Sequence, residues 1–155
     1  MSAVPDMVFH DILVAVDGSK DAALALAAAI LAVQRNHARL TVIAVAEDVT
    51  RRPGAIAFDP TLQQRVDEST EEHLRDAVTA IPQEIPVTTL FRRGRPGPAI
   101  VAAAKEGEHD AILLGARGVG RVGSLMGSVS QHVLHHASVT VFVAHAPRGG
   151  VSVRE

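Results

Sequence analysis

Residues 111–130 read AILLGARGVGRVGSLMGSVS. The stretch opens with a short apolar run, which is typical of a strand buried in a sheet. A glycine-rich loop follows, and from Ser128 onward apolar residues recur at helical spacing. A buried strand, a glycine-rich loop and a helix in this order are elements of a βαβ fold, in which successive strands are parallel. The stretch therefore predicts a parallel α/β fold.

The rest of the chain repeats this alternation of strand and helix. Five short runs rich in Val and Ile are apolar enough for strands buried on both faces, and helical patterns separate them. Alternating strands and helices with right-handed crossovers predict a three-layer α/β sandwich with a five-stranded parallel sheet, Rossmann-like and open doubly wound. The predicted strands are residues 12–16, 40–45, 87–91, 111–114 and 139–143.

The four predicted helices have recognisable starts or apolar stripes. Ser19 is the predicted N-cap of the first helix, the third spans about residues 98–105, and the fourth begins near Ser128. The second is amphipathic, with acidic and basic residues on the face opposite the apolar one. Its predicted apolar stripe is Leu62, Val66, Thr70, Leu74, Val78 and Ile81.

Composition indicates one globular domain over residues 1–155, with a flexible tail at 147–155. The net charge of −2 argues against a dedicated nucleic-acid binder, and the absence of Cys excludes disulfides and thiolate chemistry. The longest apolar run, residues 22–33, is too short to cross a membrane, and residues 1–10 lack the features of a secretory signal. We therefore expect a soluble cytoplasmic protein.

Functional residues are expected where the strands end, because ligands of open α/β sheets bind at the carboxyl ends of the strands. After the fourth strand, glycines let backbone N–H groups approach a phosphate, and Ser128 opens a helix whose N-terminus favours an anion. Arginines that follow the third and fourth strands are expected to gather around a polyanionic ligand. The alternative is a flexible surface loop with solvated arginines. These arginines are Arg92, Arg93, Arg95, Arg117 and Arg121.

Two other nucleotide motifs overlap the glycine-rich loop, and both are incomplete. Residues 118–123 match the dinucleotide pattern G-x-G-x-x-G, but no acidic residue lies between Asp110 and Glu155 to bind a ribose. Ser124 stands where a P-loop requires lysine. The sequence therefore argues against an NAD site and against a P-loop.

Metal-binding and catalytic patterns are also incomplete. His132 and His136 have the spacing of a zinc-binding helix but lack its glutamate, so we expect surface histidines. Asp17, Glu47 and Asp48 follow neighbouring predicted strands and could together contact a divalent metal ion. The chain has no G-x-S-x-G nucleophile elbow, and hydrolase chemistry has no candidate nucleophile.

The glycine-rich loop and the Asp17-Gly18-Ser19 turn together resemble the universal stress protein family. Its ATP-binding members have the pattern Gly-x2-Gly-x9-Gly-Ser/Thr between a strand and the last helix. The resemblance spans about residues 9–146, although here eight residues, not nine, separate the second glycine from the third. The residues that match the pattern are Gly115, Gly118, Gly127 and Ser128.

The resemblance implies that the site binds ATP, ADP or AMP, together with the Mg²⁺ that accompanies the phosphates. Asp17 would contact the adenosine; the alternative for this side chain is capping of the first helix together with Ser19. Ala15 and Val45 would line the adenine pocket. The residues implied to hold ribose and phosphates are Gly115, Gly118, Gly127, Ser128 and Val129.

The expected function is that of a stress-response binding module for adenine nucleotides, with at most slow ATP hydrolysis. The alternatives are a nucleotide-free dimeric interaction module and an enzyme of adenylyl or phosphoryl transfer. The last strand, residues 139–143, is apolar and has no Lys or Pro to protect an exposed edge. This composition predicts a homodimer paired through that strand, and the resembled family often dimerises in this way.

Overall fold

The computed structural model describes residues 8–51, 59–118 and 126–147. Its strands are β1 (Asp11–Ala15), β2 (Arg39–Glu47), β3 (Val87–Gly94), β4 (Ala111–Gly115) and β5 (Thr140–Ala144). Its helices are α1 (Lys20–Asn36), α2 (Pro60–Ala80), α3 (Pro96–Glu106) and α4 (Ser128–His136), with a short 3-10 helix, η1 (Val49–Arg51).

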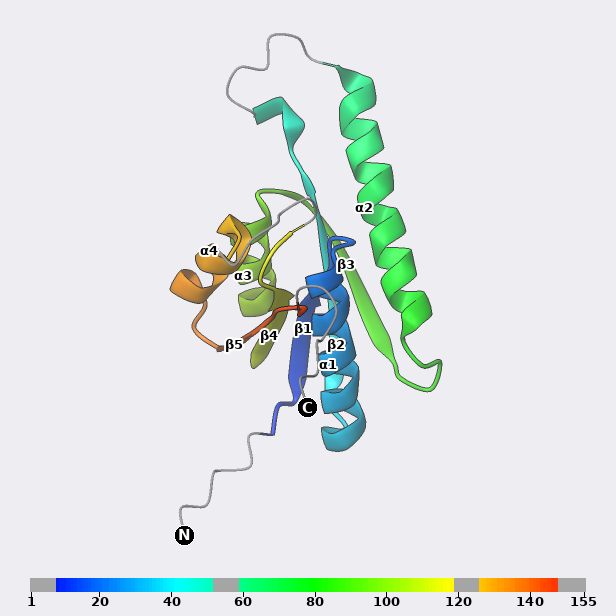
Figure 1. Ribbon diagram of the computed structural model, residues 1–155, viewed down its shortest axis with the longest axis vertical. Helices are drawn as coiled ribbons and strands as arrows, with labels where there is room; N and C mark the ends of the chain where they lie inside the picture. The colour runs from blue at the N-terminus through cyan, green and yellow to red at the C-terminus, as the bar shows by residue number, and fades with distance from the viewer. Residues whose placement is uncertain (1–7, 52–58, 119–125, 148–155) are drawn as a thin grey trace, which may run out of the picture.

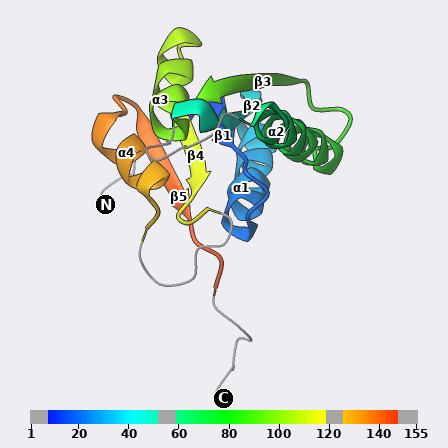
Figure 2. The same cartoon turned by 90° about the horizontal axis from the view of Figure 1, so that it is seen from above.

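All neighbouring strands are parallel, and the sheet has the order β3-β2-β1-β4-β5. Figures 1 and 2 show α1 and α2 on one face of this sheet and α3 and α4 on the other. The arrangement confirms the predicted three-layer α/β sandwich with a five-stranded parallel sheet.

The central strand β1 is buried on both faces of the sheet. Successive side chains of a strand point to opposite faces, so β1 contributes to a separate hydrophobic cluster on each face. Ile12 and Val14 have no exposed surface and pack in one cluster with Ala29 of α1. Leu13 is equally buried in a second cluster, with Ile100 of α3. The continuous apolar run of β1 thus supplies both hydrophobic cores.

The two edge strands are less buried than the sequence predicted. In β3, Thr88 and Thr89 are exposed, and in β5, Phe142 is 44% exposed. Each edge strand has one neighbour, so it lies at the margin of the helical layers. The apolar and β-branched composition of these segments therefore identified them as strands but overestimated their burial.

The predicted apolar stripe of α2 is correct except at the start of the helix, since Val66, Leu74 and Val78 are half-buried. Thr70 and Ala77 are its buried residues, whereas Leu62 is 37% exposed. Figure 1 shows the start of α2 extending well beyond the end of β1. Ile81 is buried, but it lies just past the helix as its C-cap residue.

The strands that follow β1 are added to the sheet first on one side of β1 and then on the other. From β1 the chain proceeds outward to β2 and β3, and it then returns to β4 on the other side of β1. Helix α1 therefore leaves β1 towards one face, and α4 follows β4 on the opposite face (Figure 2). Diverging connections of this kind leave a crevice at the carboxyl ends of the two strands.

Within the described ranges, no helix is both long enough and apolar enough to cross a membrane. The tail predicted from residue 147 lies outside those ranges from residue 148 onward.

Candidate functional site

A cavity of about 390 Å³ lies in the crevice at the carboxyl ends of β1 and β4. Its walls come from the ends of β1, β2 and β4, from the turns after β1 and β4, and from the starts of α3 and α4. Every residue that the family resemblance assigned to the nucleotide site lines this one cavity. These residues are Ala15, Asp17, Val45, Gly115, Gly118, Gly127, Ser128 and Val129.

One side of the cavity is apolar. Ala15 and Val45 come from neighbouring strands and are joined there by Ile43, Ile100 and Leu114. Ala15 and Val45 are half-buried, and both pack on the hydrophobic cluster beneath α3 and α4. Small aliphatic side chains at strand ends leave a slot suited to a flat apolar ring.

Asp17 forms part of the wall without capping the first turn of α1. Ser19 is the N-cap residue, and its Oγ accepts a hydrogen bond from the Ala22 N–H at 3.1 Å. Asp17 Oδ1 accepts one from the Ser19 N–H at 2.9 Å, across a turn in which Gly18 has a φ of 81°. A Cβ on Gly118 would lie 3.1 Å from Asp17 Oδ2, so the turn after β4 closely approaches this carboxylate.

The N-terminus of α4 also lines the cavity. Gly127 is its N-cap residue, with φ −69° and ψ 165°, and among the described residues no side chain caps the helix. Ser128, Val129 and Ser130 form its first turn and line the cavity. The first backbone N–H groups of a helix have no partner within the helix, and the helix dipole is positive at this end. This end of α4 therefore favours an anionic group.

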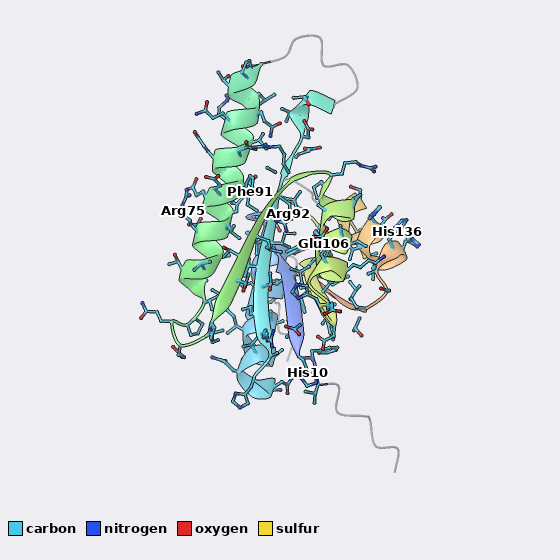
Figure 3. All side chains as sticks on the ribbon, turned by 180° about the vertical axis from the view of Figure 1, so that it is seen from behind. His10, Arg75, Phe91, Arg92, Glu106 and His136 are labelled. Atoms are coloured by element: carbon cyan, nitrogen blue, oxygen red, sulfur yellow. The ribbon has the colours of Figure 1, made fainter. Side chains whose placement is uncertain are left out.

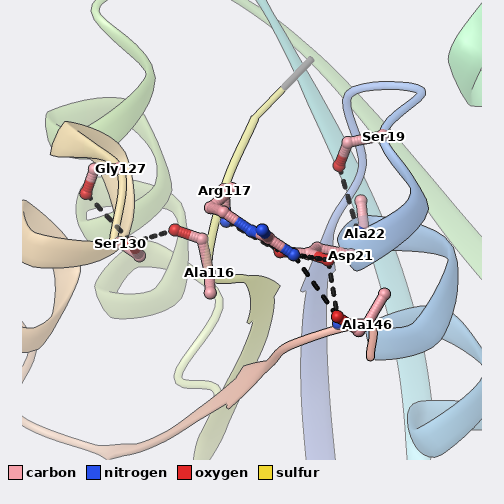
Figure 4. Close-up of polar contacts among 8 residues, drawn as sticks. All are labelled: Ser19, Asp21, Ala22, Ala116, Arg117, Gly127, Ser130 and Ala146. Carbon is pink, nitrogen blue, oxygen red and sulfur yellow. Dashed lines mark hydrogen bonds and ion pairs between the residues drawn. The ribbon is translucent and has the colours of Figure 1, made fainter. Parts of the chain in front are cut away.

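The turn after β4 is joined to α1 by a buried ion pair (Figure 4). Asp21 is 3% exposed, and its Oδ2 accepts hydrogen bonds from the backbone N–H and the Nε of Arg117, both at 3.1 Å. Its Oδ1 accepts from the Ala146 N–H at 2.9 Å. Burial alone would raise the pKa of Asp21, but the bonds from Arg117 and Ala146 outweigh it and hold this pKa below its ordinary value.

The predicted gathering of arginines around a polyanion is therefore wrong for Arg117, which is directed at Asp21. Arg93 also has a carboxylate partner, because it forms an ion pair with Asp67 of α2. That pair lowers the pKa of Asp67. The Arg117 guanidinium joins the turn after β4 to α1, and the Arg93 guanidinium joins β3 to α2. Arg121 lies outside the described residues.

The model of the universal stress protein family matches residues 9–145. The chain belongs to this family. A universal stress protein of Thermus aquaticus is 37% identical over 137 residues, which is 87% of this chain and 98% of the relative.

Solved universal stress proteins share its fold. The protein UspA of Lactobacillus plantarum superposes with a TM-score of 0.70 at 29% identity, covering 87% of this chain and 97% of that one. A universal stress protein of Archaeoglobus fulgidus, solved in complex with dAMP, has a TM-score of 0.68 at 22% identity. That comparison covers 89% of this chain and 99% of the other.

The acidic residues that follow the strands of this universal stress protein do not act as a group. Asp17 and Glu47 line the cavity, whereas Asp48 Oδ1 accepts hydrogen bonds from the N–H and Oγ1 of Thr50. Among the residues that the structure describes, no three His, Cys, Asp or Glu side chains are grouped as a metal site.

The sequence analysis expected surface histidines on α4, and His136 is exposed, whereas His132 is half-buried. The rings of His132 and His136 stack with centroids 4.0 Å apart, and Figure 3 shows His136 on the outer side of the helix. His132 also lies against Gly97, where any Cβ would come within 2.8 Å of its ring. His132 therefore contributes to the packing of α3 against α4, with the ring of His136 stacked on its outer side.

Two residues of this region were missed by the sequence analysis as contributors to the site. Asp21 reads as an ordinary acidic residue in the first turn of a helix, where the helix dipole favours it. Ser130 reads as the continuation of a family motif, yet it is 1% exposed and hydrogen-bonds two backbone carbonyl groups. A polar residue at a buried helical position was the available signal for Ser130.

Proposed function

We propose that the protein binds adenine nucleotides, including ATP, in the cavity at the ends of β1 and β4. The observation that supports this most is the meeting of three chemistries in one cavity. An apolar slot at Ala15 and Val45 suits a flat base, and the Asp17 carboxylate can accept hydrogen bonds from hydroxyl or amine groups. The start of α4, which no described side chain caps, suits phosphate.

The roles of the lining residues follow from where they lie. Asp17 contacts the adenosine, while Ser128 and Val129 offer backbone N–H groups and a hydroxyl to the phosphates. Gly115 and Gly118 let the backbone of the turn after β4 approach the ligand closely. The dAMP complex of the Archaeoglobus fulgidus relative supports an adenine nucleotide as the ligand class.

Binding rather than rapid turnover is the proposed activity, in a stress-response module that hydrolyses ATP slowly at most. Asp17 and Glu47 are the only ionisable side chains among the residues that line the cavity in the described part of the chain. Both belong to the strand ends, whereas α4 contributes backbone groups, hydroxyls and Val129. Mg²⁺ would arrive with the phosphates, since Mg²⁺ is usually bound through one or two carboxylates and the phosphates of the substrate.

The direct test is titration calorimetry with ATP, AMP and adenosine, with GTP as the control for the base. We expect the adenine ligands to bind more tightly than GTP. Because the chain has no Trp or Tyr, nucleotide that copurifies with it is also readily detected in the absorbance spectrum. If no adenine ligand binds at millimolar concentration, the nucleotide-free interaction module becomes the better description.

Replacing Asp17 with alanine is expected to weaken adenosine binding far more than it weakens the fold. Loss of hydrogen bonds to a charged group costs about 1.5–3 kcal/mol in binding. Ser19→Ala is the matched control, because it removes the cap bond to Ala22 and should cost about 1 kcal/mol in stability with little change in affinity. Melting temperature and calorimetry on both variants separate the two roles. Unchanged affinity in Asp17→Ala would contradict the proposed contact.

The protein is also proposed to form a homodimer through the edge strand β5. Phe142 is 44% exposed there and stacks edge-to-face on Phe9, with ring centroids 5.5 Å apart. An apolar edge with unpaired backbone groups favours pairing with a second copy about a two-fold axis. We expect light scattering to give a dimeric mass, and Phe142→Lys to shift it towards the monomer. A monomeric mass for the natural chain at micromolar concentration would overturn the proposal.

A further inference from the structure

We propose that Asp21 is a positioning residue for the phosphate-binding side of the cavity, a role that rests on the proposed nucleotide binding. It acts through the peptide group that joins Ala116 to Arg117. The N–H of this peptide group belongs to Arg117 and its C=O belongs to Ala116, so bonds to the two residues fix a single plane. Figure 4 shows this peptide group between α1 and α4.

The N–H side of the peptide group is held by α1. Asp21 Oδ2 accepts the Arg117 N–H at 3.1 Å and also the Arg117 Nε at 3.1 Å. The carboxylate thus binds the backbone and the side chain of the same residue. Bonds of this kind are charge-assisted, and they are stronger than neutral ones. The arginine side chain is 12% exposed, which places the ion pair away from bulk water.

The C=O side of the same peptide group is held by α4. The Ala116 carbonyl oxygen accepts the Gly127 N–H at 2.7 Å and the Ser130 Oγ hydrogen at 2.9 Å. Gly127 is the N-cap residue of α4, and Ser130 Oγ also bonds the Gly127 carbonyl oxygen at 3.0 Å. The orientation of the peptide plane therefore determines where the N-terminus of α4 sits against the turn after β4.

The neighbours of this peptide group are the residues proposed to meet the ligand. Ala116 and Gly118 line the cavity on either side of Arg117, and Ser128 lines it at the start of α4. A peptide plane fixed from both sides keeps the N–H groups of α4 aimed at one point before a ligand arrives. Preorganised donors of this kind bind an anion without losing the free energy needed to order them.

The test compares the affinities of ATP and adenosine for the natural chain and for Asp21→Asn by titration calorimetry. Asparagine is close in size to aspartate but lacks the negative charge that binds Arg117. Adenosine has no phosphate, so its affinity should remain within about twofold, whereas that of ATP should fall about tenfold. A change in the ATP-to-adenosine ratio reports positioning at the phosphates, which a general loss of stability would not alter.

Asp110→Asn is the matched control. Its carboxylate also accepts two backbone N–H groups, from His10 at 2.7 Å and Asp11 at 3.1 Å. These bonds lie at the start of β1, at the opposite end of the strand from the cavity. We expect Asp110→Asn to lower the melting temperature while it leaves the ATP-to-adenosine ratio unchanged.

Ser130→Ala tests the same peptide group from its C=O side and serves where Asp21→Asn does not fold. It should also lower the affinity for ATP selectively. An unchanged ratio in the folded variants, or an equal change in Asp110→Asn, would overturn the positioning role while nucleotide binding stands. If the natural chain binds neither ATP nor adenosine, the proposed function itself fails, and the positioning role fails with it.

Discussion

Replacing Asp21 with alanine is expected to lower the free energy of unfolding by about 3–5 kcal/mol, the range found when one partner of a buried ion pair is removed. The variant leaves the Arg117 guanidinium, which is 12% exposed, without this carboxylate. It also removes the acceptor of the Ala146 N–H, which donates to Asp21 at 2.9 Å. Urea denaturation followed by circular dichroism measures the loss. A midpoint equal to that of the natural chain would show that the pair contributes nothing.

The stability that the Asp21 carboxylate confers should depend on pH. The pKa of Asp21 in the folded protein lies below its ordinary value, so the unfolded chain takes up the proton first as the pH falls. The stability that the ionised group confers is complete above about pH 4, the ordinary range of aspartate, and is lost as the pH falls through the lower pKa of the folded state. Asp21→Asn should therefore show a weaker dependence of stability on pH below about 4 than the natural chain.

Replacing Gly115 with alanine is expected to cost about 1–3 kcal/mol of stability through overpacking, or more if the backbone cannot move. An added Cβ would lie 2.7 Å from the Cβ of Asp21 and 2.8 Å from the Ala22 nitrogen. Those atoms belong to the first turn of α1, so the helix itself would have to shift. Because this turn also holds Arg117, the melting temperature and the affinity for ATP should fall together.

Gly127→Ala provides the comparison for Gly115→Ala. At Gly127 the nearest atom to an added Cβ is the Ala116 carbonyl oxygen at 3.5 Å, an ordinary contact, and its φ of −69° is open to alanine. Alanine is a poorer N-cap than glycine, which should cost about 0.5–1 kcal/mol. A larger loss at Gly127 than at Gly115 would contradict the packing argument.

The layout of the fold and the location of the cavity could be predicted from local patterns in the sequence, whereas lining residues such as Ala15 and Val45 were identified through the family resemblance. Buried strands leave continuous runs of Val, Ile and Leu, as in residues 111–114. A parallel sheet places the residues that follow its strands at one edge. Asp17 and Gly118 are therefore brought together from opposite parts of the chain by topology alone, without any pairwise signal.

The partners of charged side chains could not be predicted in this way. Arg117 follows a strand and stands beside glycines, which is also where a phosphate-binding arginine would stand. Its pairing with Asp21 joins residues 96 positions apart and depends on the distance between α1 and the end of β4. The exposure of Leu62 was missed for a related reason, since a helical stripe does not reveal how far the helix extends past the sheet.

The carboxylate of Asp21 also bears on the order in which the chain folds. Its bond to Ala146 spans 125 positions, and β1 acquires its second neighbour only when β4 has been made. Contacts so distant in sequence form late and slowly, because a long loop must close before they contribute. During synthesis from the N-terminus, α1 emerges with an acidic side chain whose donor at Ala146 is added 125 positions later. We therefore expect the native packing of α1 against the sheet to be completed only after β4 and Ala146 have been synthesised.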